Sequence, residues 1–323
     1  MKALTLTQPW RAWALGMGQG GFVNTSKFDL GKTLQQLEFC RLTLAKASAA
    51  KGRVAMTLAG VTDPVVCALM LADGRPEMVQ RAIRSFRAQT YQNAWLLIFN
   101  SGEPGLVWRD MNPREICVSA AAWRGHTIGA LRNAAITLAL TADIIVHWDS
   151  DDWSHPLRIE EQVALLQASG KACVGYRDIL FWDTREIQPD LSAYRFQMAR
   201  MTLPEAWIYS NGDARYTVGA SMCYWRAAWA ACPFDDAPHE DLRWFMKNAE
   251  RCIGDRAIFS AWHMPSAPAL DPRMVCGIHG VNTEQYLRTD MLRAAPEWRR
   301  APEWDKYCAD VMRLERQRRD HER

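Results

Sequence analysis

The stretch Ala142–Pro156, ADIIVHWDSDDWSHP, decides the fold. Its apolar part, 143–148, has the length and composition of a buried strand. Three carboxylates, Asp149, Asp151 and Asp152, follow within four positions, and like charges this close repel one another. Because a bound cation would offset that repulsion, the stretch predicts a strand that delivers acidic side chains to a cation site.

Strands and helices alternate on both sides of this stretch. We predict strands over 65–71, 94–99, 116–119 and 143–148, with helices over 76–89, 128–140 and 156–169. A further strand over 172–182, a strand leading into a helix over 216–231, and a helix over 240–252 follow. This order predicts an α/β fold whose mostly parallel sheet is flanked by helices. Ligands of such sheets bind beyond the carboxyl ends of the strands, where the three aspartates emerge.

Composition narrows the class of protein. The 323 residues are 49% hydrophobic and 23% charged, as in a globular protein. No apolar run is long enough to predict a membrane span, and the amino terminus lacks the apolar core of a signal peptide. Nine cysteines stand singly without a CxxC pair, which favours thiols in a reducing compartment over disulfides or a zinc site. We therefore expect a cytoplasmic protein.

The distribution of charged and apolar residues along the sequence divides the chain into three predicted parts. Residues 1–60 form a basic N-terminal extension with eight Lys or Arg against two acids, a balance of +6. Residues 61–290 form the α/β domain that contains the three aspartates, and 291–323 a charged C-terminal helical tail. The basic extension is either a solvated face or a contact surface for a polyanion.

Six segments, taken in chain order, carry a resemblance to a known family. They are RPEMVQRAIRSFRAQTY (75–91), GALRNAAITLA (129–139), DSDDWSHP (149–156), GASMCYWRAAW (219–229), FDDAPHEDLRWF (234–245) and IHGVNT (278–283). Together they resemble family-2 glycosyltransferases of the GT-A type, and the likeness runs over about 65–283. The resemblance implies a Rossmann-like GT-A fold and an inverting transfer of a sugar from a nucleotide sugar to an acceptor hydroxyl.

The resemblance also implies a divalent cation, Mn²⁺ or Mg²⁺, on the donor's phosphates. By this resemblance Asp151 is the direct metal ligand, and Asp149 holds the donor's ribose or the metal shell. His279 completes the metal sphere as a neutral imidazole, or else binds phosphate or packs.

An acceptor hydroxyl must lose its proton as it attacks the sugar, and a carboxylate can take that proton. Asp241 is the predicted base and Glu240 the alternate. The other interpretation of this acidic pair is that it only stabilises the N-terminus of a helix.

Donor recognition is where the sequence departs from the family. The loops after the first two strands are LADGRP (71–76) and FNSGEP (99–104), in which Asp73 and Asn100 are predicted to reach the base and ribose. Asn100 stands where relatives usually carry a carboxylate that accepts from a uracil ring nitrogen. Arg132 is predicted to meet the nucleotide or its diphosphate, and a UDP-sugar is the expected donor.

The acceptor stays open at this stage. The opening MKALTLTQPWRAWAL resembles the start of ASCH domains, which are associated with nucleic acid, and with the basic extension it favours a hydroxymethylated DNA base, as in phage DNA modification. A glycan, lipid or protein acceptor is the alternative. Two further alternatives are a nucleotidyltransferase on the same fold and a non-catalytic module that binds DNA or sugar through some of the 15 tryptophans.

Overall fold

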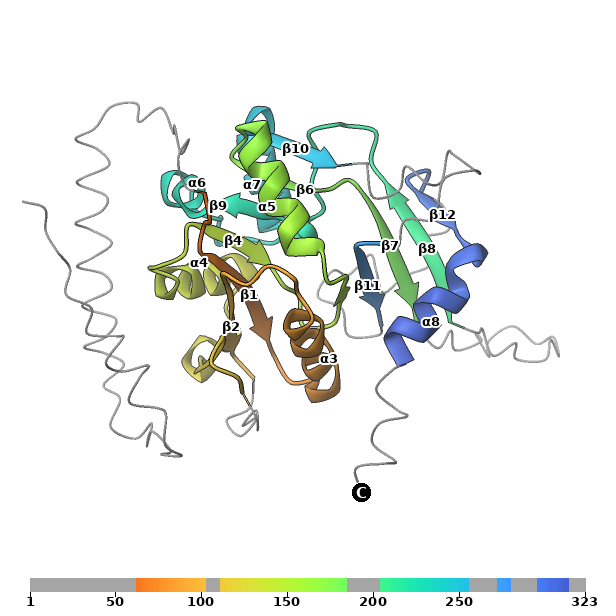
Figure 1. Cartoon of the computed structure of the whole chain (residues 1–323), viewed down its shortest axis with the longest axis horizontal. Coiled ribbons are helices and arrows are strands. Elements are labelled where there is room, and N and C mark those ends of the chain that lie inside the picture. Colours follow the sequence, from red (N-terminus) through yellow and green to blue (C-terminus); the bar gives the residue numbers. More distant parts are fainter. Residues whose placement is uncertain (1–61, 103–110, 185–203, 256–271, 280–294, 314–323) are drawn as a thin grey trace, which may run out of the picture. The chain divides into compact units, whose positions relative to one another are not determined.

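The computed structural model describes residues 62–102, 111–184, 204–255, 272–279 and 295–313 (Figure 1). The chain separates into two compact units, Met1–Met56 and Thr57–Arg323. The predicted basic extension and its ASCH-like start lie outside the described residues, so the account below concerns the second unit.

A seven-stranded sheet in the order β10-β6-β9-β4-β1-β2-β3 forms the centre of this unit. Its strands are β1 (Val66–Ala72), β2 (Ala94–Asn100), β3 (Glu115–Ser119), β4 (Ile144–His147), β6 (Cys173–Tyr176), β9 (Cys223–Trp225) and β10 (Cys252–Asp255). Strands β1 to β4 run parallel, as do β6 and β10, while β9 is antiparallel to both of its neighbours. The predicted α/β fold with a mostly parallel sheet is confirmed.

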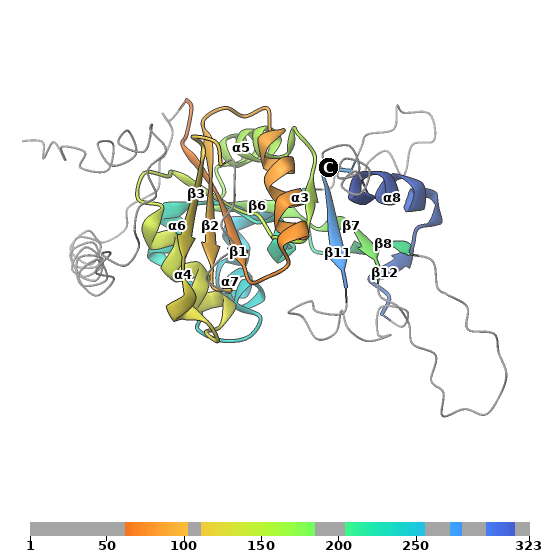
Figure 2. The same cartoon turned by 90° about the horizontal axis from the view of Figure 1, so that it is seen from below.

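Helices cover both faces of this sheet. They are α3 (Pro76–Arg87), α4 (Ile128–Leu138), α5 (Arg158–Ser169), α6 (Arg226–Ala231) and α7 (Glu240–Asn248), with short 3-10 turns η2 (Ala121–Trp123), η3 (Gly219–Ser221) and η4 (Ala249–Arg251). Trp148 donates to the Ala82 carbonyl of α3 at 2.9 Å and lies under the Arg158 guanidinium of α5. The preceding residue, His147, contacts Phe234 instead, on the side of α4 and α7. Since successive strand residues point to opposite faces, α3 and α5 cover one face and α4 and α7 the other (Figure 2).

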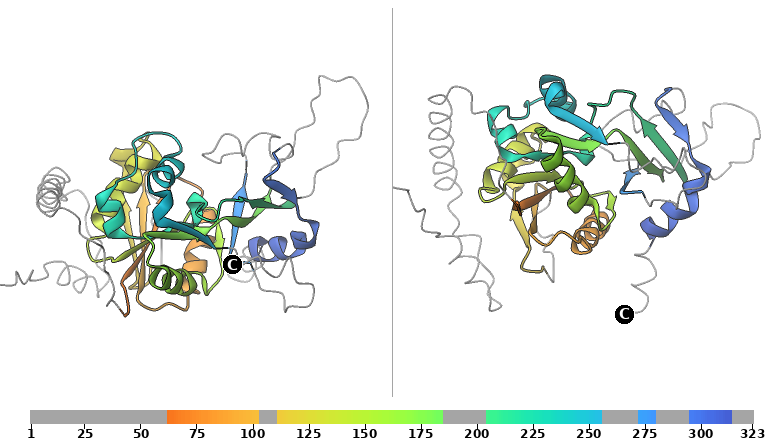
Figure 3. Two further views of the ribbon diagram at one scale, coloured as in Figure 1. Left: turned by 90° about the horizontal axis from the view of Figure 1, so that it is seen from above. Right: turned by 45° about the horizontal axis from the view of Figure 1, so that its top comes forward.

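A second sheet, in the order β12-β8-β7-β11-β5, stands beside the first (Figure 3). Its strands are β5 (Trp153–Ser154), β7 (Asp178–Asp183), β8 (Glu205–Ser210), β11 (Met274–Ile278) and β12 (Trp298–Arg300). The single strand predicted over 172–182 is thereby divided, because β6 pairs with β9 and β10 whereas β7 pairs with β8 and β11. Both halves are buried, and the strand-like residues on either side of Arg177 and Asp178 do not show that the pairing partners change there.

The structure describes residues 295–313 of the predicted charged C-terminal tail. Residues 298–300 form β12 on the edge of the second sheet, and η8 (Pro302–Trp304) leads into α8 (Asp305–Arg313). Trp298 packs on Phe181 with ring centroids 4.7 Å apart, and Ala301 and Cys308 are fully buried. The charges lie on one side of an amphipathic helix, so its apolar side can complete the second core.

Two predictions from composition concern the whole chain. No cysteine in the described ranges is joined in a disulfide. No helix among the described residues is both long and apolar enough to cross a membrane.

Candidate active site

The three aspartates after β4 separate, because each finds a different partner. Asp152 turns inward, is buried, and accepts a hydrogen bond from the Gly277 amide of β11 at 3.0 Å. Burial, and then the charges of Asp151 and Asp149, raise the pKa of Asp152 well above its usual value. This carboxyl group anchors the loop to the second sheet and leaves the other two to face the site.

Asp151 meets His279, which follows β11. Oδ2 of Asp151 lies 2.8 Å from Nε2 of His279 and 3.0 Å from Nη1 of Arg75. Burial by itself would raise the pKa of Asp151, but the hydrogen bond from His279 and the charge of Arg75 outweigh it and hold that pKa below its usual value. The Asp151 carboxylate is therefore ionised at neutral pH and able to bind a cation.

The pair of Asp151 and His279 fits a divalent cation. A carboxylate oxygen and an imidazole nitrogen are both ligands of Mn²⁺, and the two atoms are close enough to share one ion. In the part of the chain that the structure describes, no group of three or more His, Cys, Asp or Glu side chains is arranged around a common point. The donor set thus fits a cation that takes its remaining ligands from outside the protein.

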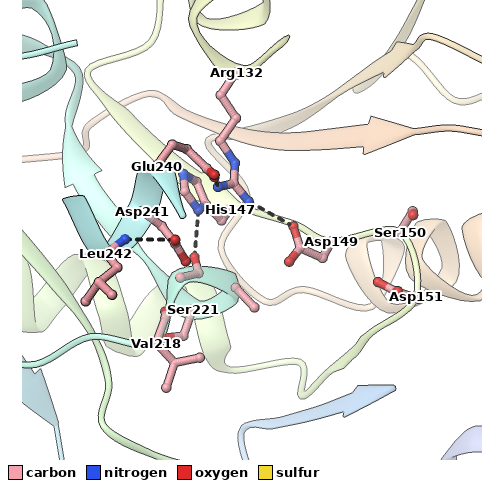
Figure 4. A network of polar contacts seen from close by, with 12 residues as sticks. Arg132, His147, Asp149, Ser150, Asp151, Val218, Ser221, Glu240, Asp241 and Leu242 are labelled. Carbon is pink, nitrogen blue, oxygen red and sulfur yellow. Dashed lines mark hydrogen bonds and ion pairs between the residues drawn. The ribbon is translucent and has the colours of Figure 1, made fainter. Parts of the chain in front are cut away.

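Asp149 lies on the opposite side of the loop, toward α4 and α7. Arg132 of α4 is 3.6 Å from Oδ1 of Asp149 and also forms a buried ion pair with Glu240, the first residue of α7. Figure 4 shows this guanidinium between the two carboxylates, with Asp151 farther along the loop. Burial raises the pKa of Asp149 and of Glu240, and the charge of Arg132 opposes that rise in both. One arginine therefore joins the acidic loop to the helix that carries Asp241.

Asp241 stands in the first turn of α7 and is half-buried. Its carboxylate lies directly over Gly219 of η3, where a Cβ would come within 1.6 Å of Oδ2. The Gly219 carbonyl accepts a 2.6 Å hydrogen bond from Nδ1 of His147, whose Nε2 is 3.2 Å from the Tyr224 hydroxyl. Burial, then the charge of Arg132, lowers the pKa of His147 well below its usual value, so a neutral imidazole fixes η3 beneath Asp241.

The two residues predicted to contact the nucleotide sugar, Asp73 and Asn100, also lie close to a common point. Asn100 ends β2 beside Ala72, the last residue of β1. A Cβ at Gly102 would lie 3.1 Å from Oδ1 of Asp73 and 3.2 Å from Oδ1 of Asn100, so both side chains face this glycine. Asn100 is buried and accepts from the Gly102 amide at 3.1 Å, whereas Asp73 is exposed.

Sequence reasoning did not single out four residues of this site: Arg75, His147, Arg158 and Gly219. Arg158 is fully buried and donates to the His147 and Ala220 carbonyls at 2.8 and 3.0 Å. A glycine that precedes a small-residue turn, as at 219, is a weak signal for close approach. The two arginines and the histidine give no such signal, because their partners are distant in the sequence.

A search of curated proteins finds no match to the chain. Among solved structures, S. aureus TarS 1-349 is 12% identical with a TM-score of 0.40, over 58% of this chain and 55% of that one. The mannosyltransferase PcManGT from Pyrobaculum calidifontis, in complex with GDP-Man and Mn²⁺, is 13% identical with a TM-score of 0.46, over 87% and 80% of the two chains.

Glucosyl-3-phosphoglycerate synthase from Mycobacterium tuberculosis, with Mn²⁺, UDP-glucose and phosphoglyceric acid, is 14% identical with a TM-score of 0.37, over 68% and 70%. The chain spans little more than half the length of the TarS chain.

The family comparison is specific. Residues 69–227 match the sequence model of glycosyl transferase family 2, a span that begins within β1 and includes the acidic loop and β9. The acidic pair of α7 and His279 lie beyond that span. With the mixed α/β fold and its mostly parallel sheet, the match over residues 69–227 confirms the resemblance to family-2 glycosyltransferases of the GT-A type that the sequence shows.

Proposed function

We propose that the protein is an inverting, divalent-cation-dependent glycosyltransferase that moves a sugar from a nucleotide sugar to an acceptor hydroxyl. The observation that carries this proposal is the contact of Arg132 with both Asp149 and Glu240. It ties the acidic loop, where a donor would bind, to the helix that carries a carboxylate for the acceptor.

In this proposal Asp151 and His279 hold Mn²⁺ or Mg²⁺. When bound, that ion would supply positive charge to the diphosphate that leaves from the sugar. Asp152 keeps the loop in place through Gly277, and Arg132 holds Asp149 toward the donor.

Asp241 is the proposed base. It would accept the proton of the acceptor hydroxyl while the hydroxyl oxygen attacks the anomeric carbon on the face opposite the departing diphosphate, which inverts the configuration there. Glu240 is unsuited to this task because its carboxylate is buried against Arg132. We assign Glu240 a positioning role, in which it fixes the first turn of α7.

Asp73 and Asn100 are the proposed contacts for the base and ribose of the donor, and a UDP-sugar is the first donor to test. Asn100 can accept or donate through its amide, and its Oδ1 already accepts from Gly102. A thermal-shift panel of UDP-, GDP-, dTDP- and CMP-sugars with Mn²⁺ reads out the preferred nucleotide as the largest rise in melting temperature.

For the acceptor we propose a hydroxyl group, with a hydroxymethylated DNA base and a simple glycan as the two classes to test. The DNA interpretation depends on residues 1–60, which lie outside the described residues, and no described contact favours it over the glycan. Mass spectrometry of both acceptors after incubation with the preferred donor distinguishes them by which one gains the mass of the sugar.

The proposal as a whole is tested by Asp151→Asn. This substitution keeps the size of the side chain but removes the charge that binds a cation. We expect turnover in Mn²⁺ to be lost while the circular dichroism spectrum stays that of the wild type. Full activity of the Asp151→Asn protein, or of the wild type in excess chelator, would contradict the proposal.

A further inference from the structure

Arg75 holds an unusual position between β1 and α3. Its backbone is left-handed, with φ 54° and ψ 54°, and it follows Gly74, whose φ is 67°. A residue with a long side chain rarely adopts this conformation, and the residue before a proline, here Pro76, is restricted further. Backbone strain of this kind persists where surrounding contacts impose it and is concentrated at functional sites.

The contacts that impose it lie on the acidic loop. Nη1 of Arg75 is 3.0 Å from Oδ2 of Asp151 and 3.3 Å from Nε2 of His279, and Nη2 donates to the Ser150 hydroxyl at 3.2 Å. The same two atoms, Oδ2 and Nε2, are the ones proposed to bind the divalent cation. The Arg75 side chain is 24% exposed, so it has room to turn toward solvent.

The hydrogen-bonding capacity of Asp151 and His279 shows why a positive group is needed beside them. To bind a metal through Nε2, His279 must present a lone pair there in place of the N–H that donates to Asp151 at 2.8 Å, and the Asp151 oxygen then presents a second lone pair to the first. Two lone pairs facing each other repel unless a positive group lies between or beside them. Nη1 of Arg75, within 3.3 Å of both atoms, is such a group.

We infer that the Arg75 guanidinium competes with the divalent cation for Asp151 and His279, and that it must leave them before both can bind the ion. This inference rests on the proposed function, because it takes those two residues as the ligands. Beyond the proposed function, we infer that the Arg75 guanidinium occupies the cation site of the protein. This occupancy lowers the affinity for Mn²⁺ when no nucleotide sugar is bound.

The neighbouring Arg81 also reaches the acidic loop from α3, where it donates to the backbone carbonyl of Asp151. That backbone contact holds the loop in place when the Arg75 guanidinium turns away from the carboxylate.

The experiment is a titration of the full chain with Mn²⁺ alone, in which the free ion is followed by electron paramagnetic resonance. Arg75→Gly is the informative variant, because glycine adopts φ 54° without strain and the fold should be kept or stabilised. Arg84→Ala is the matched control, since it removes one positive charge from the exposed side of the same helix. The variant Asp151→Asn tests whether the Mn²⁺ that is bound depends on the Asp151 carboxylate.

We expect Arg75→Gly to bind Mn²⁺ about tenfold more tightly than the wild type, because one unit charge beside the ligands is removed. Arg84→Ala should bind as the wild type does, and Asp151→Asn should abolish the binding in either background. Equal or weaker binding by Arg75→Gly, with binding still lost in Asp151→Asn, overturns this inference and leaves the proposed cation site standing. Binding that is absent, or insensitive to Asp151→Asn, overturns both.

Discussion

The carboxylate of Asp241 occupies the space that a side chain at Gly219 would need: a Cβ there would lie 1.6 Å from Oδ2 and 2.6 Å from Cγ of Asp241. Glycine at 219 is therefore required by the position of the proposed base. The turn below is fixed from the other side by His147, which donates to the Gly219 carbonyl. Position 219 can thus be used to move Asp241 without changing it.

Gly219→Ala should displace the Asp241 carboxylate while the fold is retained, since the clashing atoms are the end of a side chain. If Asp241 is the base, kcat should fall by about 10²-fold or more, the contribution typical of a positioned base, with the KM for the donor little changed. Steady-state kinetics measures both. Gly212→Ala is the control, because no atom lies within 4 Å of a Cβ at that position and its activity should be that of the wild type. Unaltered kinetics of Gly219→Ala would remove Asp241 from the chemistry.

Glu240 and Asp241 are adjacent but should respond differently to substitution. Asp241→Asn removes the proposed base, so kcat should drop by about 10²- to 10⁴-fold. Glu240→Gln removes only a charge that faces Arg132, and a smaller loss of about tenfold is expected from poorer positioning. Steady-state kinetics of the two variants separates the roles, because only Asp241→Asn removes the group that is proposed to take the proton. The reverse pattern would make Glu240 the base.

Asp152 should make the stability of the protein depend on pH. Its pKa is raised well above the usual 3.8, so over the interval between the two values the folded state binds more protons than the unfolded chain. Stability contributed by this group therefore falls as pH rises through that interval and is level above it. Asp152→Asn keeps an oxygen for the Gly277 amide but cannot ionise.

Melting temperatures in chelator, from about pH 4 to pH 8, measure this effect. The wild type should lose stability relative to Asp152→Asn as the pH increases, and the variant should be the more stable of the two at neutral pH. A wild type that gains stability relative to the variant over the same range would show that the buried carboxylate is ionised and well solvated.

Arg158 is the buried cation that holds β4, β5 and η3 together. Its guanidinium is fully buried, donates to the Ser154 hydroxyl and to the His147 and Ala220 carbonyls, and lies over the Trp148 ring. Arg158→Met would leave two buried carbonyl groups without these donors, which should cost about 3 kcal/mol of unfolding free energy. Urea denaturation measures that loss. Arg215→Met, at an exposed arginine paired with Asp213, should leave the midpoint almost unchanged.

Much of the fold follows from local pattern. The apolar run of β4, the proline that opens α3 and the helical spacing of α4 and α7 each specify an element from a few neighbouring residues. The pattern failed over 172–182, where the pairing partners change between β6 and β7. The local signal there is the same for one long strand as for two strands that belong to different sheets.

In the candidate active site, too, some features follow from local sequence and others from contacts between distant segments. By itself, the sequence determined that carboxylates follow β4 and that an acidic pair opens α7, because short segments carry those features. Only the tertiary structure decided which carboxylate meets which partner. Asp151 lies against His279, 128 positions away, and Arg132 against Glu240, 108 positions away. Hydrophobic periodicity reports how one segment is buried, whereas the ionisation of a carboxylate depends on the charges that folding brings to it from distant segments.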